Sequence, residues 1–142
     1  MRIYFAGSIR GGRDEEKVYL KIIDYLSGFG EVLTEHVGHK NVEKSEKNYS
    51  DTYIFDRDIQ WLKSSDVMVA DVTVPSLGVG YEIGIAETLN IPILCLYNPK
   101  DKKRLSAMIT GNKNLTWKEY NSLTDAQLLI KDFLSNIQNN IN

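Results

Sequence analysis

Hydrophobic residues occur along the chain in two alternating patterns. Short continuous apolar runs predict strands that are buried on both faces, as in a parallel sheet covered by helices. These runs are residues 3–6, 32–33, 67–70, 92–97 and, more weakly, 115–120. Apolar residues at helical spacing predict helices over residues 13–29, 49–65, 80–89 and 124–139. The alternation predicts an α/β fold with a five-stranded, mostly parallel sheet, and we expect one domain over residues 1–142.

One acidic residue lies on the apolar side of its predicted helix. After the apolar run that ends at Asp71, a Pro/Ser/Gly turn leads into the helix expected over residues 80–89. At about 100° per residue, Glu82 opens this helix close to Ile85 on the apolar stripe, whereas Glu87 projects from the other side. Ligands of open α/β sheets bind just past the carboxyl ends of the strands. Glu82 is therefore the candidate catalytic group.

A second acidic residue repeats this pattern in the helix expected over residues 49–65. Asp58 falls inside an apolar arc, whereas Arg57 takes the polar side. The arc consists of Ile54, Phe55, Ile59, Trp61 and Leu62. A single buried acid is ordinary when it satisfies a backbone donor or caps an element. Two such acids favour a functional reason, because burial of an unpaired charge is costly.

Two inward-facing acids suggest glycosyl chemistry, in which one attacks an anomeric carbon and the other handles the proton of the leaving group. Spacing in the sequence leaves open whether Glu82 and Asp58 meet in space.

A glycine-rich turn over residues 7–12 follows the first strand and precedes a helix. Backbone N–H groups at such a place bind anions, and Arg10 adds a fork-shaped phosphate donor. The turn lacks the Gly-Lys-Ser/Thr ending of a Walker A loop and the glycine offsets of a dinucleotide fingerprint, so we expect no cofactor. The glycines serve equally well for a tight connection. Ser8, Arg10 and Ser76 together favour a phosphate ligand.

Composition narrows the function classes. The chain has 17 Lys and Arg against 19 Asp and Glu, so it has no basic excess that would indicate nucleic-acid binding. No run approaches the ~20 apolar residues of a membrane span, and the N-terminus is typical of a strand rather than of a signal peptide. Cys95, alone of its type, excludes an internal disulfide framework, suits a cytoplasmic location and is expected in the core. His36 and His39 lack metal-ligand partners at the usual spacing, so no metal is expected.

Five segments resemble the 2′-deoxynucleoside 5′-monophosphate N-glycosidases (Rcl type) of the nucleoside 2-deoxyribosyltransferase superfamily. These segments are Tyr4–Gly12, Leu33–Val37, Asp58–Leu62, Pro75–Glu82 and Leu105–Ile109. The resemblance covers nearly the whole chain in order, apart from residues 40–50 and the tail after Tyr120. It implies a flavodoxin-like three-layer fold and a homodimer whose active sites are shared between subunits.

The resemblance also implies a role for individual residues. Glu82 would attack C1′ of the deoxyribose, Asp58 would assist departure of the base and activate water, and Tyr4 would orient Glu82. Ser8, Arg10 and Ser76 would hold the 5′-phosphate, helped by Ser106 of the partner subunit. The full substrate-binding set that it implies is Gly7, Ser8, Ile9, Arg10, Gly11, Ser76, Gly78, Ser106, Ala107 and Met108. We assign no role to His36 or Asp71.

Three functions remain open at this point: hydrolysis of deoxynucleoside monophosphates, transfer of the deoxyribosyl group to a second base, and nucleotide binding without turnover. An oxocarbenium-like transition state forms more easily without a 2′-hydroxyl, which favours deoxy substrates. The hydroxyl of Ser76 leaves room for a phosphate dianion. The chain also resembles the nucleoside transferases, in which the matching loop is usually acidic. An acidic residue at position 76 would repel the phosphate. The base preference, and the strictness against ribonucleotides, stay open.

Overall fold

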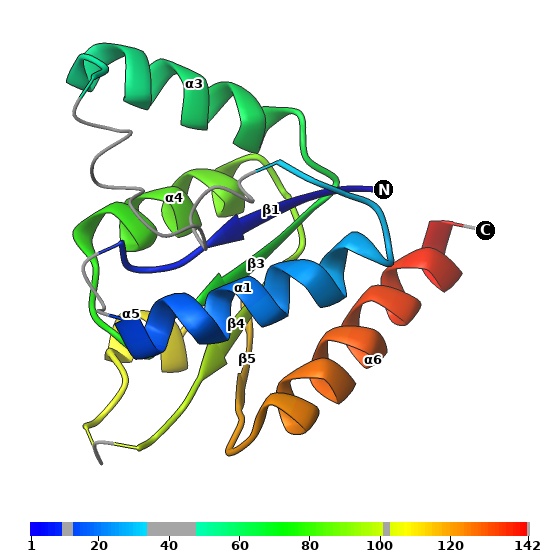
Figure 1. The fold of residues 1–142 in the computed structure, drawn as a ribbon. Helices are drawn as coiled ribbons and strands as arrows, with labels where there is room; N and C mark the ends of the chain where they lie inside the picture. Colours follow the sequence, from blue (N-terminus) through cyan, green and yellow to red (C-terminus); the bar gives the residue numbers. More distant parts are fainter. Residues whose placement is uncertain (10–12, 34–47, 101–102, 142) are drawn as a thin grey trace.

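The computed structural model describes residues 1–9, 13–33, 48–100 and 103–141 and shows one sheet with helices on both faces (Figure 1). In chain order the elements are β1 (Arg2–Ala6), α1 (Arg13–Ser27), β2 (Glu31–Val32), α3 (Asp51–Lys63), β3 (Val67–Asp71), α4 (Leu77–Thr88), β4 (Ile93–Tyr97), α5 (Ala107–Thr110), β5 (Thr116–Glu119) and α6 (Leu123–Ile141). Helices α1 and α6 pack together on one side of the sheet, and α3 and α4 lie on the other side. None of the described helices is both long and apolar enough to cross a membrane.

The strand order is β2-β1-β3-β4-β5, and every neighbouring pair is parallel. This is the flavodoxin-like order, so the α/β prediction is confirmed, with a sheet that is parallel throughout rather than mostly. The order reverses between β1 and β3, which pair from Ile3 with Val67 to Ala6 with Ala70. The carboxyl ends of β1 and β3 therefore form the switch point, where doubly wound sheets bind their ligands.

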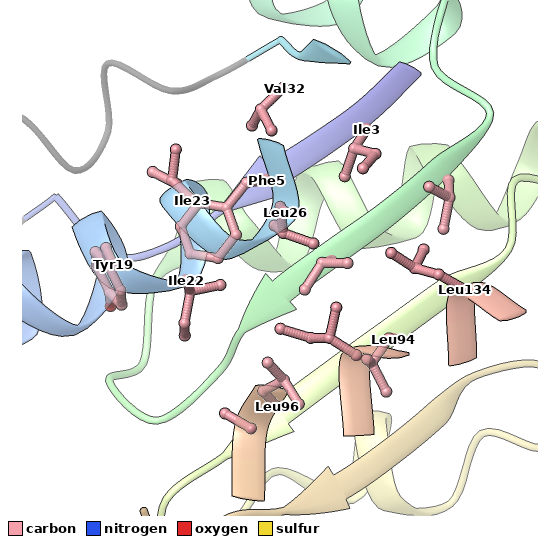
Figure 2. Close-up of a cluster of buried hydrophobic side chains, with 14 of the residues drawn as sticks. Ile3, Phe5, Tyr19, Ile22, Ile23, Leu26, Val32, Leu94, Leu96 and Leu134 are labelled. Atoms are coloured by element: carbon pink, nitrogen blue, oxygen red, sulfur yellow. The ribbon is translucent and has the colours of Figure 1, made fainter. Parts of the chain in front are cut away.

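The alternation of side chains along each strand divides the core into two clusters. Ile3 and Phe5 of β1 face α1 and α6, and Figure 2 shows them among the side chains of those two helices. Tyr4 and Ala6 face the opposite way, toward α4. Cys95 is fully buried in this second cluster, as expected of a small core residue. The same alternation decides which residues of β1 can reach a site on the α4 side.

Helix α4 begins at Leu77, earlier than the sequence pattern indicates. The side chain of Ser76 caps it by accepting a hydrogen bond from the backbone N–H of Val79 at 3.3 Å. Glu82 therefore lies in the second turn of α4 and does not open the helix, which corrects our prediction. Glycines at 78 and 80 made the first turn resemble a loop, whereas the cap and the buried Val79 keep it helical. Residues 107–110, for which the sequence pattern predicts no helix, form the short helix α5. Ser106 caps it by accepting a hydrogen bond from the backbone N–H of Met108 at 3.2 Å.

The apolar arc predicted for α3 is only partly covered. Leu62 is its one buried residue, and Phe55 remains 49% exposed. Helix α3 contacts α4 and packs against the second core cluster mainly through its C-terminal part, which explains why the N-terminal aromatic side chains stay accessible.

Candidate active site

The centre of the candidate site is a hydrogen bond between β1 and α4. The hydroxyl of Tyr4 donates to Oε1 of Glu82 at 2.6 Å. Tyr4 is buried on the α4 face of the sheet, and Glu82 is partly buried in the second turn of α4. This bond is the one that the family resemblance implies for the two residues. It places a carboxylate beside the middle of the sheet, near the carboxyl end of β1.

The surroundings of Glu82 bring its protonation change close to neutral pH. Three effects together raise the pKa of Glu82 from 4.5 to about 7: burial raises it most, the hydrogen bond from Tyr4 lowers it, and the negative charge of Asp58 raises it. Burial and the charge of Glu82 raise the pKa of Tyr4 well above its ordinary value. Tyr4 therefore stays protonated and remains a donor to Glu82 at every pH of interest.

Asp58 lies on the same side of the sheet as this pair, because α3 packs against α4 and the second core cluster. Its charge raises the pKa of both Tyr4 and Glu82. Its Oδ1 accepts a hydrogen bond from Arg57 Nε at 2.9 Å, and both side chains are mostly buried. The guanidinium of Arg57 also lies over the ring of Trp61, 4.9 Å from its centre. Our assignment of Arg57 to the polar, solvated side of the helix was wrong: it shares the sheltered side with Asp58.

The end of β1 supplies the first part of the predicted substrate-binding set. Gly7 packs so closely on α1 that an added Cβ atom would lie 2.8 Å from the ring of Tyr19. Ser8 is buried, whereas Ile9 is exposed. Arg10 and Gly11, as well as His36, lie outside the described residues.

A second part of the set lies around a cavity of about 330 Å³ between α4 and α5. Ser76, Ser106 and Met108 line it, together with Arg104. Gly78 is adjacent to Ser76, and Ala107 is exposed in the first turn of α5. The structure thus brings Ser76 and Ser106 of one chain to the same cavity, a proximity that the sequence did not indicate.

This cavity lies on the flank of α4 opposite Glu82. Glu87 lines it and accepts hydrogen bonds from the side chains of Asn112 and Asn114 at 2.9 and 2.8 Å. Glu87 and Glu82 are five residues apart, which corresponds to about 140° around the helix. The two acids of α4 therefore lie in different surroundings. Glu87 is hydrogen-bonded to Asn112 and Asn114 and is not the solvated polar residue that its position predicts.

A buried polar cluster on the α1 side of the sheet was not predicted from the sequence. Asp71 is fully buried and accepts hydrogen bonds from the hydroxyl of Tyr120 at 2.6 Å and from the backbone N–H of Thr73 at 3.0 Å. Burial raises the pKa of Asp71. Asp71 ends a continuous apolar run and the two tyrosines of the cluster, Tyr19 and Tyr120, fit apolar patterns. A strand-terminal aspartate near tyrosines at apolar positions was the available signal.

Among residues 1–9, 13–33, 48–100 and 103–141, no group of three or more His, Cys, Asp or Glu side chains could hold a metal ion. His39, like His36, falls outside these residues.

The sequence and the fold were compared with those of known proteins. Residues 3–129 match the family model described as nucleoside 2-deoxyribosyltransferase. The chain belongs to this family.

Relatives within the family are similar over most of their length. A protein of Danio rerio is 54% identical over 112 residues, which cover 78% of each chain. A protein of Tetraodon nigroviridis is 44% identical over 141 residues, covering 96% of this chain and 99% of the relative. Both are named 5-hydroxymethyl-dUMP N-hydrolase. Among solved structures, the CMP N-glycosidase BcmB of Clostridium botulinum has a TM-score of 0.67 at 21% identity and covers 92% of this chain and 99% of its own, which shows a shared fold.

Proposed function

We propose that the protein hydrolyses the N-glycosidic bond of 2′-deoxynucleoside 5′-monophosphates and releases the free base and 2-deoxyribose 5-phosphate. The observation that carries the proposal is the hydrogen bond from Tyr4 to Glu82 in a partly buried site. The charge of Asp58 raises the pKa of Glu82 in the same site. The printed names of the two fish relatives, each an N-hydrolase of a deoxynucleoside monophosphate, support the same substrate class.

In the first step the carboxylate of Glu82 attacks C1′ of the deoxyribose. Tyr4 holds Oε1, so Oε2 is the attacking atom. The new bond joins Oε2 to C1′ while the bond from C1′ to the base nitrogen breaks, and its electron pair leaves with the base. In the resting form the proton lies on Glu82 and the charge on Asp58, whereas in the reactive form Glu82 is the carboxylate and the proton lies on Asp58. Asp58 delivers this proton to the departing base. The product on the protein is a glycosyl ester.

In the second step water hydrolyses the glycosyl ester. Asp58, now a carboxylate, takes a proton from water as the water oxygen bonds to C1′. The bond from C1′ to Oε2 breaks, and its electron pair returns to Glu82 as a carboxylate. Tyr4 donates to Oε1 in the free carboxylate, so it stabilises the attacking form and the leaving form of the same group.

The 5′-phosphate is placed between the end of β1 and the start of α4. Ser8, Arg10 and Ser76 are its proposed ligands, with Gly7, Ile9, Gly11 and Gly78 lining the subsite. Ser76 Oγ accepts the N–H of Val79, which leaves its own proton to donate to a phosphate oxygen. The N-terminus of α4 adds a favourable field for an anion.

A homodimer is part of the proposal, with Ser106, Ala107 and Met108 of α5 contributed to the neighbouring subunit's site. Several apolar side chains of α3, α4 and α5 are exposed in the single chain, and a second copy would cover them. They are Tyr53, Phe55, Leu77, Tyr81 and Met108. Mixing Glu82→Gln with Ser106→Ala protein tests the sharing. Recovery of activity is expected, because one site of each mixed dimer has both native residues. Two inactive variants that stay inactive when mixed would contradict it.

A panel of deoxynucleotides, ribonucleotides and their nucleosides, scored for released base by chromatography, tests the reaction. We expect release from deoxynucleoside monophosphates in water alone. A new nucleotide formed after addition of a free acceptor base would favour the deoxyribosyltransferase alternative. Thermal stabilisation by the nucleotides without any base release would favour a binding module. A cytoplasmic location, proposed from the single cysteine, is tested by fractionating cells of the source organism.

A further inference from the structure

The backbone that ends β1 is held from the α1 side by a single tyrosine. The N–H of Ser8 donates to the hydroxyl of Tyr19 at 3.2 Å, in a buried position. The ring of the same tyrosine lies against Gly7, where even one methyl group would approach to 2.8 Å. Tyr19 thus sets both the path of the chain at Gly7 and the direction of the amide at Ser8.

Tyr19 is itself held rigidly. It is 1% exposed and packs edge-on against Phe5, with ring centres 5.6 Å apart. Figure 2 shows both rings within the same buried cluster. A buried aromatic ring that is packed in this way has one position available, so its hydroxyl is a fixed acceptor.

Asp71 and Tyr120 belong to the same buried polar cluster as Tyr19. Asp71 follows Val67 and Val69 in the strand alternation, so its side chain faces the α1 side, where Tyr120 donates to it. Burial and the charge of Asp71 raise the pKa of both Tyr19 and Tyr120 well above their ordinary value. Both hydroxyls therefore remain neutral near neutral pH, and Tyr19 keeps its hydrogen-bonding form there.

We propose that Tyr19 is a positioning residue for the phosphate subsite: it holds the backbone of Gly7 and Ser8 so that the Ser8 hydroxyl, rather than the Ser8 amide, meets the 5′-phosphate. The amide is already bonded to Tyr19, which leaves Oγ as the polar group of Ser8 for the ligand. This inference rests on the proposed function for the identity of the ligand. It adds a residue that touches no substrate and yet determines how tightly the phosphate is bound.

Tyr19→Phe is the test, because it keeps the ring and removes only the hydroxyl. The expected result is a KM for a deoxynucleoside monophosphate, and an inhibition constant for inorganic phosphate, that both rise about tenfold while kcat stays within about twofold. Tyr25→Phe, on the same helix, is the matched control and should change neither constant. Gly7→Ala is a second variant. Its added Cβ would meet the ring of Tyr19, so it displaces the same turn and should weaken phosphate binding in the same way.

A purely structural role for the hydroxyl gives a different result. Loss of folded protein lowers kcat per total protein and leaves KM and the inhibition constant unchanged, and that outcome, or unchanged constants throughout, would overturn the proposal. If the wild-type protein releases no base at all, the proposed function fails. Calorimetry with inorganic phosphate then tests the role of Tyr19 in phosphate binding by itself. Weaker phosphate binding by Tyr19→Phe than by wild type supports it. Equal binding by both, or binding by neither, overturns it.

Discussion

The Tyr4 hydroxyl donates to Glu82 Oε1 at 2.6 Å across 78 positions of sequence, from a central strand to the second turn of a helix. The bond reaches a carboxylate whose pKa is raised to about 7, mainly by burial. It stabilises the charged form of Glu82, whereas burial and Asp58 favour the neutral form. The balance of these effects determines the pH at which Glu82 becomes a nucleophile.

Removing the Tyr4 hydroxyl should shift the acid limb of the pH–rate profile to higher pH. Tyr4→Phe deletes the hydrogen bond that lowers the pKa of Glu82, so the carboxylate forms only above the wild-type value of about 7. Activity should fall most at acidic and neutral pH and recover partly in alkaline buffer. The measurement is kcat/KM against pH, with Tyr25→Phe as the control. An acid limb at the wild-type position would contradict the arrangement.

Removing the charge of Asp58 should shift the same limb the other way. Asp58→Asn deletes an effect that raises the pKa of Glu82, so the limb moves to lower pH. The maximal rate should fall about 10²- to 10⁴-fold, because the base loses its proton donor. Asp56→Asn, an exposed neighbour on α3, is the control and should leave the profile unchanged. A limb that shifts in the same direction for Tyr4→Phe and Asp58→Asn would refute this electrostatic account.

The raised pKa of Glu82 also predicts a pH-dependent stability. The folded state holds a proton on Glu82 up to about pH 7, whereas the unfolded chain releases it near 4.5, so stability from this group is lost as pH rises between the two values. Glu82→Gln cannot ionise and escapes this loss. We expect the variant to be more stable than wild type by up to about 3 kcal/mol near pH 8 and about equally stable near pH 4. Urea unfolding at the two pH values measures the difference, and equal stabilities at both would contradict a raised pKa.

Ser76 can be tested in its two roles separately. Ser76→Ala removes the cap of α4 and the proposed phosphate ligand, so it should lower the free energy of unfolding by about 1 kcal/mol and raise KM for nucleotides. Ser76→Asp keeps a good cap but places a negative charge beside the phosphate. Its unfolding free energy should stay near the wild-type value while its preference moves from nucleotides toward nucleosides. Unchanged preference in Ser76→Asp would exclude Ser76 from the phosphate subsite.

Much of the fold follows from the sequence because strands and core helices depend on local periodicity. The runs that predict β1, β3 and β4 are buried strands, and the inward side of Glu82 follows from the angular spacing of its helix. The start of α4 does not follow in the same way. Glycines at 78 and 80 are typical of a turn, and it is the cap at Ser76 and the packing of Val79 that keep this turn helical.

The parts that the sequence could not predict depend on what lies beside a residue in space. The periodicity of α3 shows an apolar arc but not what covers it, so the exposure of Phe55 and the sheltered position of Arg57 were both missed. Tyr19 matches the apolar spacing of α1, yet its hydroxyl bonds to Ser8, eleven residues away. Polar contacts of this kind have no period, and only the folded chain brings them together.

The central claim is that Glu82 attacks the sugar, and base release by Glu82→Gln tests it most directly. Wild type, Glu82→Gln and the exposed control Glu119→Gln are incubated with the same deoxynucleoside monophosphate, and free base is measured over time. Rapid acid quench and mass spectrometry of the peptides follow the same samples. We predict that Glu82→Gln loses at least about 10³-fold in base release. An ester between the Glu82 carboxylate and C1 of 2-deoxyribose 5-phosphate should appear on the wild-type peptide that contains Glu82. Full base release by Glu82→Gln, with Glu119→Gln and wild type equally active, would contradict the account.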